Sequence, residues 1–434
     1  MSTIKNQQEI LDKLGIEELN EMQKSAENAI ALHSETVIVS PTGTGKTLAF
    51  LLPIIKLLNP DLDKIQALII TPSRELAIQI EQVIRNMGSG LKANAVYGGR
   101  SGSKDLLELS HAPAILVGTP GRLADHFRRN RVETDEIKIL VLDEFDKSLE
   151  VGFEKELREI MDVLTGLEKK ILTSATQKTS IPSFLEITDP QYLKFCDKDK
   201  SKLTLKRIDT TNKLEALLKL LNNLGTANGI IFCNFKESIQ EVSDYLADHE
   251  VRHVTFHGSL EQMERENALI KFRNGTQRIL LATDLAARGI DVPALDYIIH
   301  YELPVKEDEF IHRNGRTARM QSNGTAFVIK STTESIPDFI RDAEITEMPF
   351  AEAPPDTKWE TLFISGGRKD KISKGDVAGL FFKQGNLAKG ELGEIELKQD
   401  CAFAAVPYEK ASHLVKELNN TRLKNKKVRI RVLD

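Results

Sequence analysis

Short apolar runs alternate with amphipathic, helix-patterned stretches along most of the chain, and this alternation constrains the fold more than any other feature. Runs of three to five apolar residues indicate strands that are buried on both faces, and strands separated by helices are typically parallel. The first series comprises Thr36–Val39, Ala67–Ile70, Ala114–Val117, Ile139–Leu142 and Lys170–Leu172. The second comprises Gly229–Phe232, Val254–Phe256, Arg278–Ala282, Tyr297–His300 and Thr325–Ile329. We therefore predict an α/β fold with two successive parallel sheets, each with helices on both faces.

Two polar stretches interrupt the pattern and indicate linkers between domains. The first is Asp197–Lys202, and the second is Glu347–Asp356, which contains three prolines. A chain of 434 residues also exceeds the roughly 250–300 residues that one hydrophobic core supports. We predict three domains, comprising residues 1–200, 206–346 and 357–434.

Composition and cysteine usage narrow the cellular setting. The first residues lack the apolar segment of a signal peptide, and no apolar run is long enough to cross a bilayer. The three cysteines are far apart and form no CxxC pair, which favours a reducing cytoplasm and argues against a zinc site. Cys233 ends an apolar run and is expected to be buried packing. We expect a cytoplasmic monomer without a membrane partner.

Charge is distributed unevenly along the chain. The net charge is −5, yet residues 357–434 carry 16 Lys/Arg against 10 Asp/Glu, while the remainder carries 43 against 54. A basic C-terminal segment on an acidic body is typical of an appendage that faces nucleic acid. The asymmetry alone is also compatible with a merely solvated basic surface.

A glycine-rich segment with a lysine follows the first predicted strand. It reads Ser-Pro-Thr-Gly-Thr-Gly-Lys-Thr and precedes a helical pattern from Leu48, which is the context of a phosphate-binding loop. Glycines let backbone N–H groups approach phosphate oxygens, Lys46 would reach the β- and γ-phosphates, and the Thr47 hydroxyl would bind Mg²⁺. The predicted ATP-binding residues of this loop are Ser40, Pro41, Thr42, Gly43, Thr44, Gly45, Lys46 and Thr47, with Ser40 in place of the first glycine of the general pattern.

An acidic turn follows the run Ile139–Leu142. It reads Asp143-Glu-Phe-Asp146, so its carboxylates leave the carboxyl end of a strand, where open α/β sheets bind ligands. We expect Asp143 to hold Mg²⁺ and Glu144 to orient and deprotonate the attacking water.

Phosphoryl transfer also requires cations around the γ-phosphate. His312-Arg-Asn-Gly-Arg-Thr-Ala-Arg319 offers Arg313, Arg316 and Arg319. Arg316 and Arg319 are three residues apart, so we expect them on neighbouring turns of one helical face, able to reach a nucleotide held by the first domain. The alternative is an exposed basic helix.

Together these segments resemble the DEAD-box RNA helicases of helicase superfamily two, over about residues 10–345. Gln23 lies eight residues after Gly15, as in the adenine-reading glutamine motif, and the D-E-F-D turn stands where the family name is spelled. Ser174-Ala-Thr176 resembles the element that couples hydrolysis to strand separation. Further segments match in the expected order, namely 72–77, 98–99, 119–122, 232–234, 257–265, 282–291 and 312–319.

The resemblance implies two tandem RecA-like domains that close on ATP and single-stranded RNA. It implies that Gln23, Gly289 and Asp291 contact the nucleotide, that Arg316 and Arg319 act as arginine fingers, and that Ser174 and Thr176 take part in coupling. It further implies that RNA is held by Pro72, Arg74, Gly98, Gly99, Thr119, Arg122, Thr283 and Arg288. A site split across a linker is complete only after closure, so RNA that favours closure accelerates hydrolysis.

Several positions depart from the family pattern. No aromatic residue precedes Gln23, since the first in the chain is Phe50, so stacking on adenine and selectivity for ATP stay open. Phe145 replaces the alanine of the D-E-A-D motif, and Ser73 replaces a threonine. Asn314 replaces an apolar residue, and Ala318 replaces a glycine. None of these changes removes a reacting group.

The last domain has a different pattern. Strand patterns at Thr361–Ile364, Ile395–Leu397, Cys401–Val406 and Lys427–Leu433, with helix patterns at Gly375–Phe382 and Tyr408–Leu418, give the order β-α-β-β-α-β. This order is that of an α+β fold like the RNA-recognition motif. Only Phe363 and Phe403 could stack on bases, and core packing is an equal alternative for both. A basic surface is the other means of binding RNA, through Arg368, Lys369, Lys371, Lys424, Lys426, Lys427, Arg429 and Arg431.

This domain resembles the C-terminal domain of DbpA-type bacterial helicases in 366–371, 375–377 and 424–431. That resemblance implies tethering to a hairpin of large-subunit ribosomal RNA, within pre-ribosomal particles, during ribosome assembly. Tethering raises the local RNA concentration at the helicase core. A general cold-shock or decay helicase and an ATP-gated RNA clamp without strand separation remain alternative functions.

Overall fold

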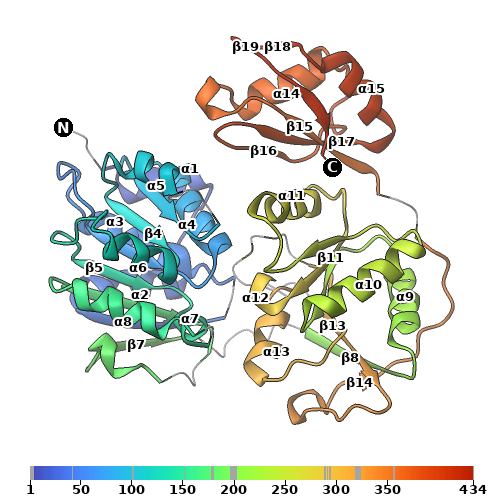
Figure 1. Cartoon of the computed structure of the whole chain (residues 1–434), viewed down its shortest axis with the longest axis horizontal. Helices are drawn as coiled ribbons and strands as arrows, with labels where there is room; N and C mark the ends of the chain where they lie inside the picture. The colour runs from blue at the N-terminus through green and yellow to red at the C-terminus, as the bar shows by residue number, and fades with distance from the viewer. Residues whose placement is uncertain are drawn as a thin grey trace. The chain divides into compact units, whose positions relative to one another are not determined.

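The computed structural model describes residues 4–41, 43–99, 102–150, 152–176, 180–195, 203–287, 290, 292, 295–317, 324–354 and 357–433. The chain forms two compact units, the first mainly from residues 1–201 and the second mainly from residues 202–434 (Figure 1). The predicted linker Asp197–Lys202 lies outside the described residues.

The first unit is built on a seven-stranded parallel sheet in the order β3-β4-β2-β5-β6-β1-β7. Its strands are β1 (Glu35–Val39), β2 (Ala67–Ile70), β3 (Ala93–Val96), β4 (Ile115–Gly118), β5 (Ile139–Leu142), β6 (Lys169–Ser174) and β7 (Gln191–Lys194). Its helices are α1 (Gln7–Leu14), α2 (Glu21–Leu32), α3 (Lys46–Leu57), α4 (Arg74–Met87), α5 (Gly102–Leu109), α6 (Pro120–Arg128), α7 (Phe145–Glu150) and α8 (Glu154–Val163).

Both faces of this sheet are buried, because successive side chains of a strand point to opposite faces. In β1, Ile38 belongs to the core under α1–α4, whereas Val37 and Val39 belong to the core under α6–α8. This double burial explains why the strands read as continuous apolar runs, and it confirms the predicted parallel α/β architecture.

The second unit contains another seven-stranded parallel sheet in the order β10-β11-β9-β12-β13-β8-β14. Its strands are β8 (Leu203–Thr210), β9 (Gly229–Cys233), β10 (Val254–Phe256), β11 (Ile279–Thr283), β12 (Tyr297–His300), β13 (Gly324–Ser331) and β14 (Glu344–Ile345). Its helices are α9 (Lys213–Leu224), α10 (Lys236–Asp248), α11 (Gln262–Arg273), α12 (Asp284–Ala287) and α13 (Glu307–Asn314). Cys233 is buried as predicted, and burial raises the pKa of its thiol to about 12.

The C-terminal module of the second unit has an antiparallel sheet in the order β16-β17-β15-β20. Its main elements are β15 (Trp359–Ile364), α14 (Lys374–Lys383), β16 (Ile395–Leu397), β17 (Ala402–Pro407), α15 (Tyr408–Leu418) and β20 (Ile430–Val432). Together they give the predicted order β-α-β-β-α-β. The helices α14 and α15 pack on one face of the sheet around Leu362, Phe381 and Leu414.

The predicted last strand, Lys427–Leu433, is wrong in its extent. Residues Lys426–Lys427 form β19, which pairs with β18 (Arg422–Leu423) in a separate hairpin, and only Ile430–Val432 joins the main sheet. Lys424 has a φ of 53° in the turn of this hairpin, so the chain reverses there. Val428 is fully buried between the two strand segments, while the Arg429 N–H donates to the Ser365 hydroxyl at 2.7 Å.

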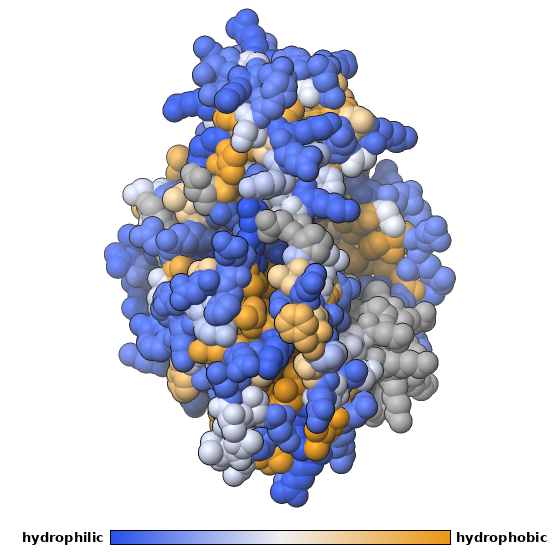
Figure 2. Space-filling view, turned by 90° about the vertical axis from the view of Figure 1, so that its right-hand side faces the viewer, coloured by the Kyte–Doolittle hydropathy of each residue, from blue (hydrophilic) through white to orange (hydrophobic). Residues whose placement is uncertain are grey.

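The described surface is mainly hydrophilic, with apolar residues in smaller areas on the face shown in Figure 2. Among the helices of the described ranges, none combines the length and the apolar character needed to cross a membrane.

Candidate functional site

Apart from Gln23, the sequence segments singled out in the first unit lie at or after the ends of strands of one parallel sheet, so they meet at its carboxyl edge. The neighbours β5, β6 and β1 lead into residues 143–146, 174–176 and 40–47. The neighbours β3, β4 and β2 lead into residues 98–99, 119–122 and 72–74. The segments predicted to hold the nucleotide thus share one half of the edge, and those predicted to hold RNA share the other half.

The glycine-rich loop turns tightly around its lysine. Gly43 and Gly45 have φ values of 83° and 89°, which a side chain would disfavour, and α3 begins at Lys46. Lys46 Nζ donates to the carbonyl oxygens of Ser40 at 2.5 Å and Pro41 at 2.9 Å. Thr42 lies outside the described residues. The loop therefore places its ammonium group and the N-terminus of a helix together, an arrangement suited to phosphate.

Gln23 contacts this loop directly. It is the third residue of α2, where its side chain accepts from the Asn20 N–H at 3.0 Å and donates to the Gly45 carbonyl oxygen at 3.3 Å. Asn20 Nδ2 donates to the Thr44 carbonyl oxygen at 3.0 Å. Sequence reasoning singled out Gln23 but missed Asn20. The feature that could have identified Asn20 is that asparagine is a preferred N-cap residue of helices.

The acidic turn lies in a buried environment. Asp143 is 3% exposed, and burial together with the charge of Glu144 raises its pKa to about 6, against the opposing effects of a Thr173 hydrogen bond and the positive charge of Lys46. The charge of Lys46 acts on Asp143 because the loop and the turn lie at the same edge of the sheet. A carboxylate from Asp143 and a hydroxyl from Thr47 are hard oxygen ligands, and they fit Mg²⁺.

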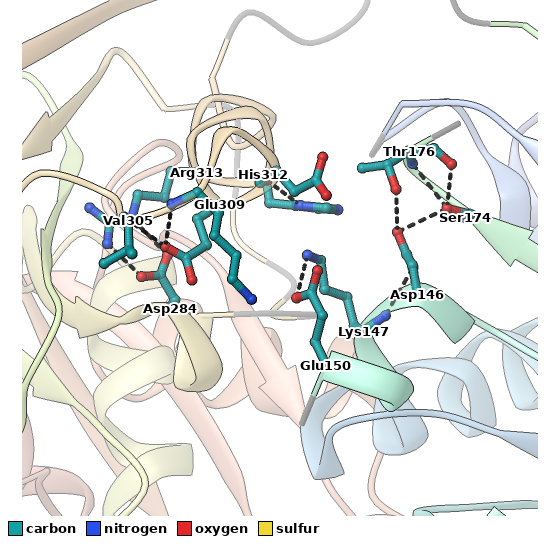
Figure 3. A network of polar contacts seen from close by, with 12 residues as sticks. Asp146, Lys147, Glu150, Ser174, Thr176, Asp284, Val305, Glu309, His312 and Arg313 are labelled. Atoms are coloured by element: carbon teal, nitrogen blue, oxygen red, sulfur yellow. Dashed lines mark hydrogen bonds and ion pairs between the residues drawn. The ribbon is translucent and has the colours of Figure 1, made fainter. Parts of the chain in front are cut away.

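The end of β6 contacts the loop and also, as Figure 3 shows, the acidic turn. Ser174 Oγ donates to Asp146 Oδ2 at 2.8 Å, and Thr176 Oγ1 donates to the same oxygen at 3.2 Å. The Ser40 N–H donates to the Ser174 carbonyl oxygen at 3.1 Å. A movement of the glycine-rich loop or of the acidic turn would therefore alter the hydrogen bonds of Ser174 and Thr176.

Thr173 is a site residue that sequence reasoning missed. Its hydroxyl donates to Asp143 Oδ1 and accepts from the Glu144 N–H at 3.0 Å. No motif marks it, because the contact depends on β6 lying beside β5 in the sheet.

On the other half of the edge, Arg74 lies against the Gly98-Gly99 turn. A Cβ atom on Gly99 would come within 2.5 Å of Arg74 Nη1, and Gly99 has a φ of 81°. Pro72, just before α4, is buried. The positive φ of Gly99 favours glycine at this position, and the absence of a Cβ leaves room for the Arg74 guanidinium.

Arg122 is held by a buried acid. Asp105 is fully buried, and its Oδ2 accepts from Arg122 Nε at 2.8 Å and lies 3.0 Å from His126 Nε2. Thr119 precedes α6, and Pro120 occupies the first turn of that helix. Neither Asp105 nor His126 was selected from the sequence, because neither residue belongs to a segment that matches a family motif.

In the second unit, the corresponding edge brings together Thr283 at the end of β11, Asn234 after β9, and α13 after β12. Arg313 points into its own unit (Figure 3). It donates to Asp284 Oδ1 at 2.7 Å, Asn234 Oδ1 at 2.7 Å and the Glu302 carbonyl oxygen at 2.8 Å. Arg313 was one of three arginines considered as cations for the γ-phosphate. These bonds instead give it a structural role within the second unit.

The expectation that Arg316 lies on a helical face with Arg319 is wrong for Arg316. The helix α13 ends at Asn314, with Gly315 as its C-cap, and Arg316 lies in the turn that follows. Thr317 Oγ1 donates to the Leu295 carbonyl oxygen at 2.5 Å. This hydrogen bond fixes the chain after Gly315 in a position outside the helix. Arg319, Arg288, Gly289 and Asp291 lie outside the described residues.

Several of the basic residues proposed for RNA binding in the module form ion pairs. Lys424 Nζ lies 2.7 Å from Asp376 Oδ2, and Lys426 Nζ lies 2.7 Å from Asp370 Oδ2. Lys369 pairs with Asp400. Arg368 lies with Lys369 in a 3₁₀ turn, Lys371 follows it at a φ of 59°, and Lys427 and Arg429 lie in and after β19. The hairpin β18–β19 thus brings its lysines to the loop that precedes α14.

The other face of the module's sheet contacts α11 of the same unit. Phe403, 4% exposed, packs with Ile270 and Leu433, and Arg273 Nη2 donates to Glu396 Oε2 at 2.6 Å. Phe363 is only partly buried and lies edge-on to Phe403. These contacts favour core packing over base stacking for Phe403.

Two parallel α/β sheets, one of which carries a phosphate loop and an acidic turn on neighbouring strands, define a nucleotide hydrolase of the P-loop class. Three family models match the chain: "DEAD/DEAH box helicase" over residues 20–184, "Helicase conserved C-terminal domain" over 212–321 and "DbpA RNA binding domain" over 361–432.

Curated relatives match nearly the whole chain. The ATP-dependent RNA helicase DbpA of Bacillus subtilis is 31% identical over 97% of this chain and 96% of its own length. The protein of the same name from Escherichia coli is 31% identical over 98% and 96%. The solved structure "S. cerevisiae Dbp5 bound to RNA and ADP BeF3" has a TM-score of 0.69, at 25% identity over 78% of this chain and 92% of that one.

The chain therefore belongs to the DEAD-box ATP-dependent RNA helicases of superfamily two, and it carries a DbpA-type RNA-binding domain. Both parallel-sheet domains are RecA-like, as the resemblance implied.

Proposed function

We propose that this helicase remodels large-subunit ribosomal RNA during ribosome assembly, with the C-terminal module selecting the RNA and the RecA-like domains acting on it. The observation that carries the proposal is the DbpA-type module at residues 361–432, joined to a complete helicase core. Its hairpin and the loop before α14 bring basic groups together, which supports a surface for phosphates. We further propose domains at 1–200, 206–346 and 357–434 in a cytoplasmic monomer.

We propose that the glycine-rich loop holds the phosphates of ATP. Backbone N–H groups of residues 40–45 and the ammonium of Lys46 bind phosphate oxygens, which requires Lys46 to leave the carbonyl groups that it contacts now. Gln23, already bonded to Gly45, reads adenine. Thr42, Gly289 and Asp291 are proposed contacts outside the described residues.

Hydrolysis is assigned to the acidic turn and the arginines of the second RecA-like domain. Asp143 and Thr47 would hold Mg²⁺, which when bound neutralises charge on the phosphates. Glu144 orients the attacking water and takes its proton, a role that its position beside Asp143 after the end of β5 supports. Arg316 and Arg319 stabilise the charge of the transition state, and Ser174 and Thr176 link the turn to RNA binding through Asp146.

RNA is proposed to lie along the β3-β4-β2 half of the first edge, on Pro72, Arg74, Gly98, Gly99, Thr119 and Arg122. In the second RecA-like domain it would contact Thr283 and Arg288, and in the module Arg368, Lys369, Lys371, Lys424, Lys426, Lys427 and Arg429. Backbone and guanidinium groups read phosphate and sugar, so the core has little sequence preference. Selection of the target therefore belongs to the module.

The test is the rate of ATP hydrolysis with intact large-subunit ribosomal RNA, bulk RNA of matched length, and DNA, at one salt concentration. Ribosomal RNA should stimulate more strongly than bulk RNA, and DNA should not stimulate. Equal stimulation by ribosomal and bulk RNA would contradict the ribosomal target and favour a general cold-shock or decay helicase. ATP-dependent RNA binding that leaves short duplexes intact would indicate a clamp.

A further inference from the structure

Thr173 lies at the point where β6 meets the acidic turn between β5 and α7. Its side chain is fully buried. Its hydroxyl donates a hydrogen bond to Asp143 Oδ1 and accepts one from the backbone N–H of Glu144 at 3.0 Å. One hydroxyl therefore contacts both residues to which hydrolysis is assigned.

The pairing of the strands explains this position. Leu142 of β5 lies opposite Leu172 of β6 in a parallel register, so the next residues, Asp143 and Thr173, are neighbours at the carboxyl edge. The following residue of β6, Ser174, bonds to Asp146 at the other end of the same turn. Two successive residues of β6 therefore hold the beginning and the end of the acidic turn.

The backbone of Glu144 needs such support. Its φ is 49°, in the left-handed region, where the backbone of a residue with a side chain is strained unless its surroundings hold it. The bond from its N–H to Thr173 is one of the contacts that do so. A rotation of this peptide would turn the carboxylates of both Asp143 and Glu144.

We propose that Thr173 is a positioning residue for ATP hydrolysis, which fixes the directions of the Asp143 carboxylate and the Glu144 backbone. This inference rests on the roles proposed for Asp143 and Glu144. The hydroxyl uses its one hydrogen on the carboxylate and a lone pair on the amide, so both contacts depend on a single orientation. The β-branched side chain restricts that orientation further.

The test uses substitutions of the full chain that separate the hydroxyl from the packing. Thr173→Val keeps the shape and removes the hydroxyl, and Thr173→Ser and Thr173→Ala differ by the hydroxyl alone. Thr36→Val is the matched control, because Thr36 is a buried threonine of β1 whose hydroxyl has no hydrogen-bond partner among the described residues. Thermal melting of each variant reports its folding.

Thr173→Val and Thr173→Ala should lower kcat of the RNA-stimulated ATPase by roughly 10- to 100-fold, the range found when partners of metal ligands are removed. The KM for RNA should stay within about two-fold of the wild-type value, since the substitution is on the nucleotide half of the edge. Thr173→Ser and Thr36→Val should retain most of the wild-type kcat. Without turnover, Mg²⁺ should tighten binding of a fluorescent ATP analogue less in Thr173→Val than in wild type.

Wild-type kcat in Thr173→Val, with Glu144→Gln inactive, would overturn the inference and leave the proposed function intact. Full activity in Glu144→Gln would instead overturn the proposed role of Glu144. An equal loss in Thr173→Ser and Thr173→Ala would assign the effect to the methyl group and also overturn the inference. If Thr173→Val does not fold, the comparison of kcat between Thr173→Ser and Thr173→Ala tests the inference.

Discussion

The guanidinium of Arg313 is fully buried in the second RecA-like domain and uses its donors on groups from three strand ends. Asn234 follows β9, Asp284 follows β11 and Glu302 follows β12. A buried charge is tolerated only when it is paired and hydrogen-bonded, and Asp284 supplies the pair. Arg313 therefore fixes the edge of the sheet from which Thr283 and α13 emerge.

Replacing Arg313 with alanine should lower the free energy of unfolding by about 3 kcal/mol or more, because it leaves the Asp284 carboxylate without its cation. The matched control is Arg341→Ala, which removes an exposed pair with Asp338 in the same unit and should cost less than about 1 kcal/mol. Urea denaturation of the full chain, followed by circular dichroism, measures both. Equal losses in the two variants would show that burial of the pair is unimportant.

His300 is a buried histidine that the structure keeps neutral. Its Nε2 lies 3.0 Å from Asn314 Oδ1 and its Nδ1 lies 3.5 Å from Arg313 Nη1, so Nε2 carries the hydrogen. Burial and the charge of Arg313 lower its pKa from 6.5 to about 3, against the hydrogen bond to Asn314. Asn314, which departs from the family's apolar residue at this position, supplies the acceptor that this histidine needs.

This pKa predicts a loss of stability in acid. Below pH 6.5 the unfolded chain binds a proton at His300 and the folded chain does not, so stability falls as pH drops from 6.5 toward 3, by up to about 1.4 kcal/mol per pH unit. Between pH 7 and pH 5 wild type should lose about 2 kcal/mol more than His300→Asn. The exposed His413→Asn serves as the control and should follow wild type. Parallel pH profiles for wild type and His300→Asn would refute the assignment.

At the scale of elements, all the strands predicted in the two parallel sheets are present. They could be predicted because strands that are buried on both faces have continuous apolar sequences. The strands β3, β7, β8 and β14 were missed because none of them reads as a continuous apolar run. In β7 most side chains are exposed, and in β8 one residue of eight is buried. Asn94 interrupts the apolar character of β3.

The phosphate loop and the acidic turn could be predicted because their chemistry resides in adjacent residues. Thr173, Asn20 and Asp105 could not, since each contacts the site through the order of strands or the packing of helices. The spacing of the arginines also led us to expect a helix that continues past Gly315. In the structure α13 ends at Asn314, and the Thr317 hydroxyl donates to the Leu295 carbonyl oxygen outside the helix.

Two glycines of the module lead to opposite predictions. A Cβ on Gly367 would lie 2.4 Å from the Gln399 carbonyl oxygen, a backbone atom that cannot yield, so Gly367→Ala should destabilise the module by about 1–3 kcal/mol. Gly379 lies inside α14 with open space around it, so Gly379→Ala should stabilise by about 0.5–1 kcal/mol.

The only tryptophan of the chain, Trp359, lies in β15, so tryptophan fluorescence reports unfolding of the module within the full protein. A lower urea midpoint for Gly367→Ala and a higher one for Gly379→Ala are expected. The same direction of change in both variants would contradict the packing described for Gly367.

At the scale of the whole molecule, ATP and RNA are assigned to two halves of one sheet edge. We propose that the residues after β5, β6 and β1 hold the nucleotide and that the residues after β3, β4 and β2 hold RNA, since these strands form the two halves of the sheet. Such a core acts on any RNA that reaches it, so a tethered module is a means of giving it a target without altering the motor. The face of the module's sheet that packs on α11 is not available for stacking on bases, which leaves its basic hairpin and loop.

The central claim is that the module directs the helicase to ribosomal RNA, and duplex separation measures it most directly. A short RNA duplex is joined either to a hairpin-containing fragment of large-subunit ribosomal RNA or to a scrambled fragment of the same length, and strand separation is followed with ATP at one salt concentration. The duplex joined to the ribosomal fragment should separate faster, and the advantage should disappear when Lys424, Lys426 and Lys427 are replaced by glutamine. Equal rates for the two duplexes with the wild-type protein would contradict the claim.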